Sequence, residues 1–136
     1  MRSVIVAGTL LLGLAAALAA ADNPDQHAQK RNAVQLTRVL NTAEQQYRSE
    51  KGRFGSFADL AAGGYLNKSD ITRKIWPSDF NSADPVHPIP GVTCRLTVSS
   101  DGKAYQVSVI ADTPPESRWA FFSDERGLIY EGQPMQ

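Results

Sequence analysis

The strongest constraint on the fold is a pair of alternating segments on either side of Asp101-Gly102. This dipeptide is a strong signal for a two-residue hairpin turn, and residues 92–100 and 103–111 flank it as candidate strands. A turn centred there determines a register that gives the pair one apolar and one polar face, with little exception. The apolar pairs are Val98 with Tyr105, Leu96 with Val107, Cys94 with Val109 and Val92 with Ala111; the polar pairs are Thr97 with Gln106 and Arg95 with Ser108. Because turn and alternation agree, the sequence predicts a half-buried antiparallel hairpin.

A second hairpin is predicted after the Asp112–Glu116 break, over residues 118–123 and 128–131. Gly127 is suited to the left-handed position that follows a turn. Both segments are apolar on both faces, so we expect at least one of these strands to be covered on both sides. The two hairpins together predict a four-stranded antiparallel meander.

Residues 24–51 predict a long amphipathic helix. Asn23 is a favourable N-cap, Pro24 suits the first helical position, and Gly52 is placed to end the helix. Glu44 and Arg48 are spaced as an i,i+4 ion pair on the helix surface. At 100° per residue, the apolar side chains fall on a stripe about 120° wide: Ala33, Leu36, Val39, Leu40, Ala43 and Tyr47. Such a stripe must pack against another element, so we predict an α+β domain in which this helix packs on the meander.

The segment between helix and meander gives weaker signals. Residues 56–62 predict a short capped helix that stops at Gly63-Gly64. Residues 67–90 show no clear period and contain four prolines, which predicts an irregular connection, interrupted at most by a short helix beginning at Ser69. Connections of this length are often functional. This one holds the residues that we select as a candidate partner-contact site: Trp76, Phe80 and His87.

The first 21 residues predict an export signal. Arg2, an uncharged run from Val4 to Ala21 and an Ala-rich junction are the parts of a bacterial secretory signal peptide. An uncleaved anchor is the alternative, because this run of 18 residues approaches the length that spans a bilayer. We therefore predict a signal peptide or anchor over residues 1–21 and a single domain over residues 22–136. The domain is expected to be periplasmic or secreted, or, with the anchor retained, tethered to the membrane outside the cytoplasm.

Charge and cysteine content limit the partners and the chemistry. The chain has 14 basic and 14 acidic side chains, and loss of residues 1–21 removes only Arg2, which leaves 13 against 14. This balance argues against nucleic acid or an anionic membrane as a main partner. Cys94 is the only cysteine, so the chain has no internal disulfide. The hairpin register places Cys94 on the apolar face, where a thiol is a core residue rather than a nucleophile.

No catalytic or cofactor-binding constellation is evident from spacing. His27 lies on the polar side of the helix, and His87 has no partner at a recognisable metal or acid–base spacing. The serines lack a nucleophile-elbow motif, and no glycine-rich phosphate loop is present. Calcium is the one ion that remains open, because five acidic residues fall in predicted loops: Asp79, Asp84, Asp112, Glu116 and Asp124. Their spacing does not match a calcium-binding loop. Since no catalytic or cofactor-binding motif is found either, we expect no enzyme and no resident cofactor.

Three stretches follow one another in an order that is informative. The first is Ala43 to Phe54, with an Ala, a Tyr and Gly-Arg-Phe at its end; the second is Phe57-Ala58-Asp59-Leu60 with Gly64-Tyr65-Leu66; the third is Phe122 to Tyr130. They resemble the end of the stem helix, the short segment after it and the closing hairpin of type IV pilins and type II secretion pseudopilins. The resemblance covers residues 34–131 and implies the globular head of a pilin-like protein.

The start of the chain departs from the pilin pattern. Pilins have a leader ending in Gly, then Phe-Thr-Leu-Ile-Glu or a close relative, then a continuous apolar helix. Here residues 4–21 contain no Glu, and Asn23-Pro24 interrupts the path into the amphipathic helix. The prepilin cleavage motif is absent, which argues against polymerisation into a pilus. The resemblance implies a head that is exported alone or is held by an uncleaved anchor.

The function that we expect is protein–protein interaction in a cell-envelope, pilus or secretion-related assembly, without catalysis. Contact surfaces are expected at residues 67–90 and 112–117. An alternative is a periplasmic or secreted small-ligand or glycan-binding protein that uses Trp76 and neighbouring aromatic residues. A third hypothesis is a hydrolase built on His87 and loop carboxylates.

Overall fold

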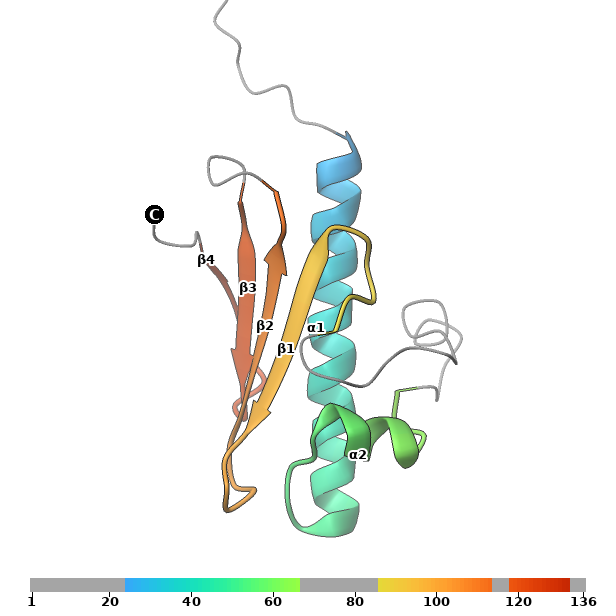
Figure 1. The fold of residues 1–136 in the computed structure, drawn as a ribbon. Coiled ribbons are helices and arrows are strands. Elements are labelled where there is room, and N and C mark those ends of the chain that lie inside the picture. Colours follow the sequence, from blue (N-terminus) through green and yellow to red (C-terminus); the bar gives the residue numbers. More distant parts are fainter. Residues whose placement is uncertain (1–23, 67–85, 114–117, 133–136) are drawn as a thin grey trace, which may run out of the picture.

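The computed structural model describes residues 24–66, 86–113 and 118–132, which form one long helix packed on a four-stranded antiparallel sheet (Figure 1). The elements, in chain order, are α1 (Pro24–Lys51), α2 (Phe57–Ala62), β1 (Val92–Val98), β2 (Tyr105–Ala111), β3 (Ala120–Asp124) and β4 (Ile129–Gly132). The α+β class, both predicted hairpins and both predicted helices are confirmed. The predicted export segment and the possible helix at Ser69 lie outside the described residues.

The register of the first hairpin is confirmed at every pair. Val98 lies opposite Tyr105, and the partners continue in step to Val92 opposite Ala111. The strand order is β1-β2-β3-β4, a plain meander. Consecutive strands are neighbours and antiparallel. Side chains alternate between the two faces along each strand, so the register of the pairs decides which side chains of all four strands share a face.

The turn between β1 and β2 differs from the two-residue turn that was predicted. The strands end at Val98 and resume at Tyr105, and the Ser99 amide donates to the Ala104 carbonyl oxygen at 2.9 Å. The Ser99 hydroxyl oxygen accepts the amides of Lys103 and Ala104, at 3.2 and 3.0 Å. These side-chain bonds give a wider loop without a change of register.

The tip of this loop is attached to the segment after α1. Gly102 has a φ of 67°, and its carbonyl oxygen accepts the Phe54 amide at 2.9 Å. A Cβ at this position would lie 2.9 Å from the Arg53 Cβ. Glycine is therefore required here both by backbone conformation and by close approach of the two loops.

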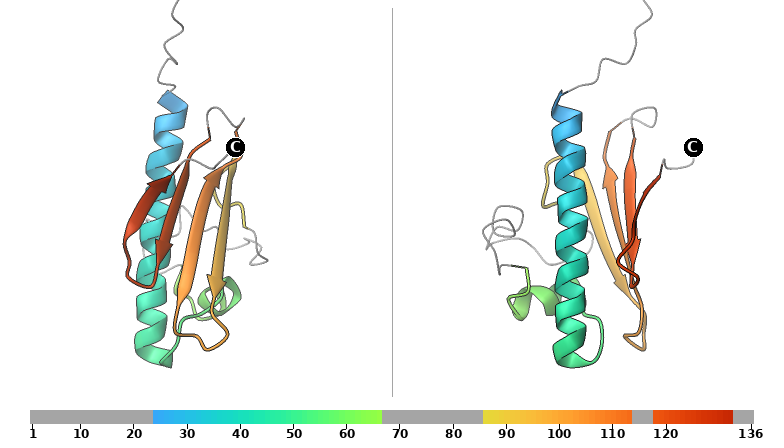
Figure 2. Two further views of the ribbon diagram at one scale, coloured as in Figure 1. Left: turned by 90° about the vertical axis from the view of Figure 1, so that its left-hand side faces the viewer. Right: turned by 180° about the vertical axis from the view of Figure 1, so that it is seen from behind.

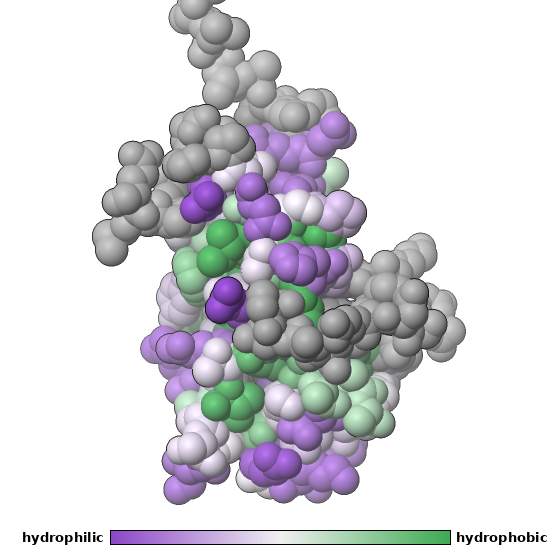
Figure 3. Space-filling model, in the orientation of Figure 1, coloured by the Kyte–Doolittle hydropathy of each residue, from purple (hydrophilic) through white to green (hydrophobic). Residues whose placement is uncertain are grey.

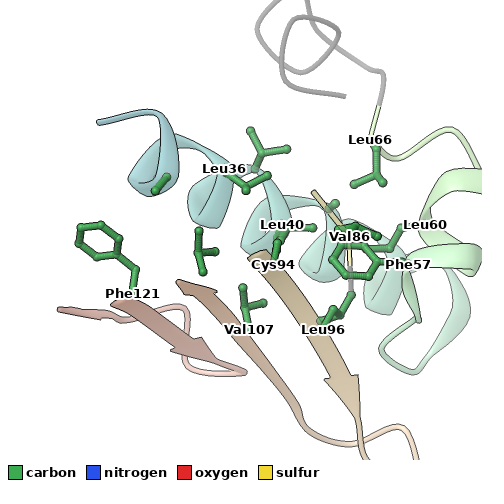
Figure 4. Close-up of a cluster of buried hydrophobic side chains, with 14 of the residues drawn as sticks. Leu36, Leu40, Phe57, Leu60, Leu66, Val86, Cys94, Leu96, Val107 and Phe121 are labelled. Atoms are coloured by element: carbon green, nitrogen blue, oxygen red, sulfur yellow. The ribbon is translucent and has the colours of Figure 1, made fainter. Parts of the chain in front are cut away.

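α1 covers one face of the sheet along its whole length (Figures 1 and 2). The predicted apolar stripe faces the sheet, and all six of its residues are buried. Figure 4 shows Leu36 and Leu40 of α1 above Val107 and Phe121 of the sheet, with Phe57, Leu60 and Leu66 closing the core beside β1. Cys94 is fully buried in this core, as predicted. On the side seen in Figure 3, hydrophobic residues are visible in the middle and hydrophilic residues gather at the lower end.

α2 closes the lower end of the core and begins with the predicted cap. The Asp59 amide donates to the Ser56 hydroxyl, and the Ser56 amide donates to the Asp59 carboxylate, which together form a capping box. Phe57 and Leu60 are the buried residues of this short helix. No helix in the three described ranges combines the length and apolar character that a membrane crossing requires.

A buried polar cluster joins α1 to the sheet. Asn41 accepts the Tyr105 hydroxyl at 2.8 Å and lies 2.8 Å from the Ser123 hydroxyl, which donates to the Leu128 carbonyl oxygen at 2.8 Å. All three side chains are buried. The cluster ties the middle of α1 to β2, β3 and the β3–β4 turn, so it determines how the helix sits on the meander.

The second face of the sheet is not covered by any described element, as Figure 2 shows. Phe122 and Tyr130 lie on this face and are 41% and 45% exposed, and Leu128 in the turn is 53% exposed. The prediction that one strand of the second hairpin is covered on both sides is confirmed at the start of β3, where Ala120 and Phe121 lie on opposite faces and are both buried. It is wrong for the rest of the hairpin, where Phe122 and Tyr130 are exposed. The apolar residues are present as the sequence indicated, but the described fold has only one helical layer to bury them.

Candidate interaction surface

Rows of side chains run across the strands of the uncovered face, called here the open face. One row consists of Thr93, Ile110, Ala120 and Gly132, and two further rows lie beside it. The strand register places Arg95, Ser108, Phe122 and Tyr130 side by side, one from each strand. The other of the two further rows contains Thr97, Gln106 and Asp124. In these two rows, the large side chains Arg95, Phe122 and Tyr130 therefore stand on β1, β3 and β4, and the polar side chains Ser108 and Gln106 stand on β2.

This distribution of sizes creates a hollow on the open face. Its volume is about 370 Å³, and these two rows line it. Ser108 and Gln106 form its floor, since β2 is a central strand between β1 and β3. Arg95 and Thr97 stand on the β1 side, and Phe122 stands on the β3 side. The hollow thus has one cationic and one aromatic wall.

The charges around the hollow are unequally compensated. Arg126 donates to both carboxylate oxygens of Asp124, with Nε at 3.1 and 2.9 Å, and this hydrogen bonding lowers the Asp124 pKa. The Arg126 guanidinium also lies 5.9 Å from the centre of the Tyr130 ring. Arg95, by contrast, is exposed and has neither an ion pair nor a hydrogen bond within the described residues. One uncompensated positive charge therefore faces the hollow.

Of the predicted contact residues, only His87 lies in the described part of the chain; Trp76 and Phe80 lie outside it. His87 is exposed, and its Nδ1 is 4.0 Å from Oδ2 of Asp112. Oδ1 of the same carboxylate accepts the Thr93 hydroxyl at 2.6 Å. The backbone explains this meeting, because Val86 and Cys94 exchange two hydrogen bonds across the edge of β1. The structure thus brings together one end of each predicted contact segment.

The His87–Asp112 pair does not make a catalytic or metal site with other described residues. Both side chains are about half exposed, and no nucleophile–base arrangement accompanies them in the described ranges. No group of three His, Cys, Asp or Glu side chains comes together there either. Among the five acidic residues considered for calcium, Asp112 and Asp124 are described, and they are engaged by Thr93 and Arg126 respectively.

Glu44 is an unusual residue that the sequence reasoning placed wrongly. It was assigned to a surface pair with Arg48, but its side chain is fully buried between α1 and the loop that leads to α2. Oε2 accepts the Gly55 amide at 2.9 Å, and Oε1 has no hydrogen-bond partner among the described residues. Arg48 instead lies over the Phe54 ring, 5.0 Å from its centre.

Burial raises the pKa of Glu44 to about 7, against the opposing effect of the Gly55 hydrogen bond, and the nearby Asp59 carboxylate raises it further.

The position of Glu44 on the helical wheel could have predicted its burial. Glu44 lies about 20° beyond Ala33, at the border of the apolar stripe, at 100° per residue. Its role in the described structure is to hold the loop after α1.

The open face is therefore the described surface best suited to binding, because it combines exposed aromatic rings, a hollow and an uncompensated guanidinium. Comparison of the chain with protein-family models, with curated proteins and with solved structures found no match. The resemblance to pilin and pseudopilin heads therefore rests on the sequence motifs and stays a prediction.

Proposed function

We propose that this protein is an exported, non-catalytic, pilin-like domain that acts by protein–protein interaction in a cell-envelope, pilus or secretion-related assembly. One observation carries the proposal: all the large hydrophobic side chains that are exposed in the described ranges lie on one hairpin. They are Phe122, Leu128 and Tyr130. Exposed apolar residues scattered singly need no explanation, but a group of them on one surface is typical of an interaction site.

The arrangement of the aromatic residues supports contact with a protein. Phe122 and Tyr130 are direct cross-strand partners, so their side chains form one continuous exposed surface. Aromatic residues and arginine are the residue types that contribute most to protein interfaces. Arg95 lines the same hollow as both rings, and Arg126 lies over the Tyr130 ring. The open face thus has the composition of an interface centre rather than of a solvated sheet.

The pilin-like part of the proposal is supported by the order of elements. A long helix, a connection, and a four-stranded meander follow one another as the resemblance implies. The motif from Ala43 to Phe54 ends α1 and leads into α2, and residues 122–130 form the closing hairpin. Because unrelated proteins share folds, this agreement bears on architecture, and the function is argued from the open face.

A second candidate function is binding of a small ligand or glycan. The hollow of about 370 Å³ favours it, since its size is at the lower end of the range for small-molecule sites, and since it contains an aromatic wall and polar groups. The hollow lies on a face that no described element covers, however, which favours an extended occupant over an enclosed one (Figure 2). Glycan-array binding that is lost on Phe122→Thr would favour this second candidate.

Site-specific cross-linking in the native host tests the proposed function. Benzoylphenylalanine is introduced at position 122 or 130, and at position 38 on the exposed side of α1 as a control. Discrete adducts with another envelope protein at positions 122 and 130, and not at 38, are the expected result. Adducts at position 38 alone, or no protein adduct at any position, would rule out the open face as the contact surface.

A further inference from the structure

We propose that the hollow on the open face binds an extended segment of a partner protein that carries an acidic side chain next to an apolar one. The carboxylate contacts Arg95, and the apolar side chain packs on Phe122 and Tyr130. This inference rests on the proposed function and names the chemistry of the partner that the open face selects.

The spacing of the two walls matches an extended peptide. Arg95 and Phe122 stand in one row on β1 and β3, with Ser108 of β2 between them. Adjacent strands are about 4.8 Å apart, so the two backbones are about 10 Å apart. Successive side chains of an extended chain point to opposite sides. A peptide that lies over Ser108, along β2, therefore directs one side chain to the cationic wall and the next to the aromatic wall.

The charges favour an acidic segment. Arg126 compensates Asp124, and Lys30 pairs with Glu131 at 2.9 Å beside β4. Arg95 is left as the uncompensated charge that faces the hollow within the described residues. A carboxylate accepts two parallel hydrogen bonds from a guanidinium, which gives orientation as well as attraction. A basic segment would instead meet a like charge at this wall.

The outer side of α1 in a second copy of this chain fits the hollow less well than an acidic segment does. The exposed charged residues of α1 are mostly basic: Arg31, Arg38, Arg48 and Lys51, against Asp25 and Glu50. The outer side of the helix would thus bring mainly cations to Arg95. We therefore assign the hollow to an acidic segment of a different protein.

The test is selection of peptides from a random dodecapeptide phage library. The full chain is immobilised as wild type, as Arg95→Glu, and as Arg38→Glu, the last being the same charge reversal on the exposed side of α1. Wild type is expected to enrich peptides with Asp or Glu within two positions of an aromatic or aliphatic residue. Arg95→Glu is expected to enrich Lys or Arg instead, and Arg38→Glu to enrich the wild-type set.

A synthetic peptide with the wild-type consensus then gives the affinities. Arg95→Glu and Phe122→Thr are each expected to weaken binding at least tenfold, whereas Arg38→Glu leaves it within twofold. Thermal unfolding of each variant confirms that it is folded. The same consensus on wild type and Arg95→Glu, a consensus without acidic residues, or no enrichment over the Arg95→Glu, Phe122→Thr double variant overturns the proposal.

The two proposals fail in different ways. Protein adducts at position 122 that persist in an Arg95→Glu background would leave the open face as a contact surface and would refute the acidic partner segment. Absence of all adducts at positions 122 and 130 would refute both.

Discussion

Phe121 and Phe122 are neighbours in β3, yet they lie on opposite faces of the sheet and in different surroundings. Phe121 is packed beneath α1 and is 5% exposed, whereas Phe122 is 41% exposed on the open face. Folding explains the first, because its burial stabilises the domain by removing apolar surface from water. Folding does not explain the second. The comparison teaches that the inner face holds the domain together, whereas the open face is available for the partner contact that we propose.

The inner face is expected to give the largest loss of stability. Leu40→Ala removes a fully buried side chain from the centre of the core, and such truncations cost about 3–4 kcal/mol. Leu128→Ala is the matched control, because the same truncation at a side chain that is 53% exposed should cost no more than about 0.5 kcal/mol. Urea unfolding of both variants gives the free energies. Equal losses would remove the distinction between the two faces.

The buried polar cluster gives the next largest effect. Asn41→Ala leaves the Tyr105 and Ser123 hydroxyls without their shared partner in the interior, which should cost about 2–3 kcal/mol. Gln45→Ala is the control on the same helix, since its hydrogen bond to the Glu125 carbonyl oxygen is exposed. The free energy of unfolding should change by less than about 0.5 kcal/mol in the control. A loss as small in Asn41→Ala would mean that the cluster does not orient the helix.

Glu44 makes the stability of the inner side depend on pH. Its pKa is raised from 4.5 to about 7 in the folded state, so the folded protein binds the proton more tightly than the unfolded chain. Its contribution is therefore fully present below pH 4.5 and is lost as the pH rises to about 7. Allowing for partial solvent screening, the loss is about 2 kcal/mol.

Glu44→Gln removes this titration and keeps the size of the side chain. Between pH 4.5 and 7.5, the free energy of unfolding should fall by about 2 kcal/mol less in the variant than in the wild type. Gln46→Ala, an uncharged change on the exposed side of α1, is the control and should keep the wild-type slope. Identical pH profiles for wild type and Glu44→Gln would show that burial of this carboxyl does not make the free energy of unfolding depend on pH.

The sequence predicted much of the fold because the relevant signals are local or follow from the alternation of side chains along a strand. The register of β1 and β2 follows from strict alternation, and a wider turn at Ser99 changed the loop without moving a single pair. The stripe of α1 follows from helical period alone. The turn geometry was missed because it depends on side-chain hydrogen bonds from Ser99 and Asp101, which no dipeptide rule contains.

The candidate site was harder to predict, because exposure depends on how many layers the fold has. An apolar residue such as Phe122 has the same pattern whether its second face is covered by the same chain or by a partner. Glu44 shows the converse, since a polar residue at the border of a stripe becomes buried only when a later loop closes over it. That Arg95 is uncompensated could not be predicted from the sequence, because it depends on which charges of the open face pair with one another. In the structure, Arg126 pairs with Asp124, and Arg95 lies in the neighbouring row without an acidic partner among the described residues.

The central claim is that the aromatic residues of the open face serve a partner and not the fold. Urea unfolding of the Phe122→Thr, Tyr130→Thr double variant tests it most directly, because threonine keeps the preference for a strand while both rings are removed. The account predicts a free energy of unfolding within about 1 kcal/mol of the wild type, because one cross-strand pair contributes no more than about that amount. A loss of about 3 kcal/mol or more, as expected for the buried Leu40, would contradict it.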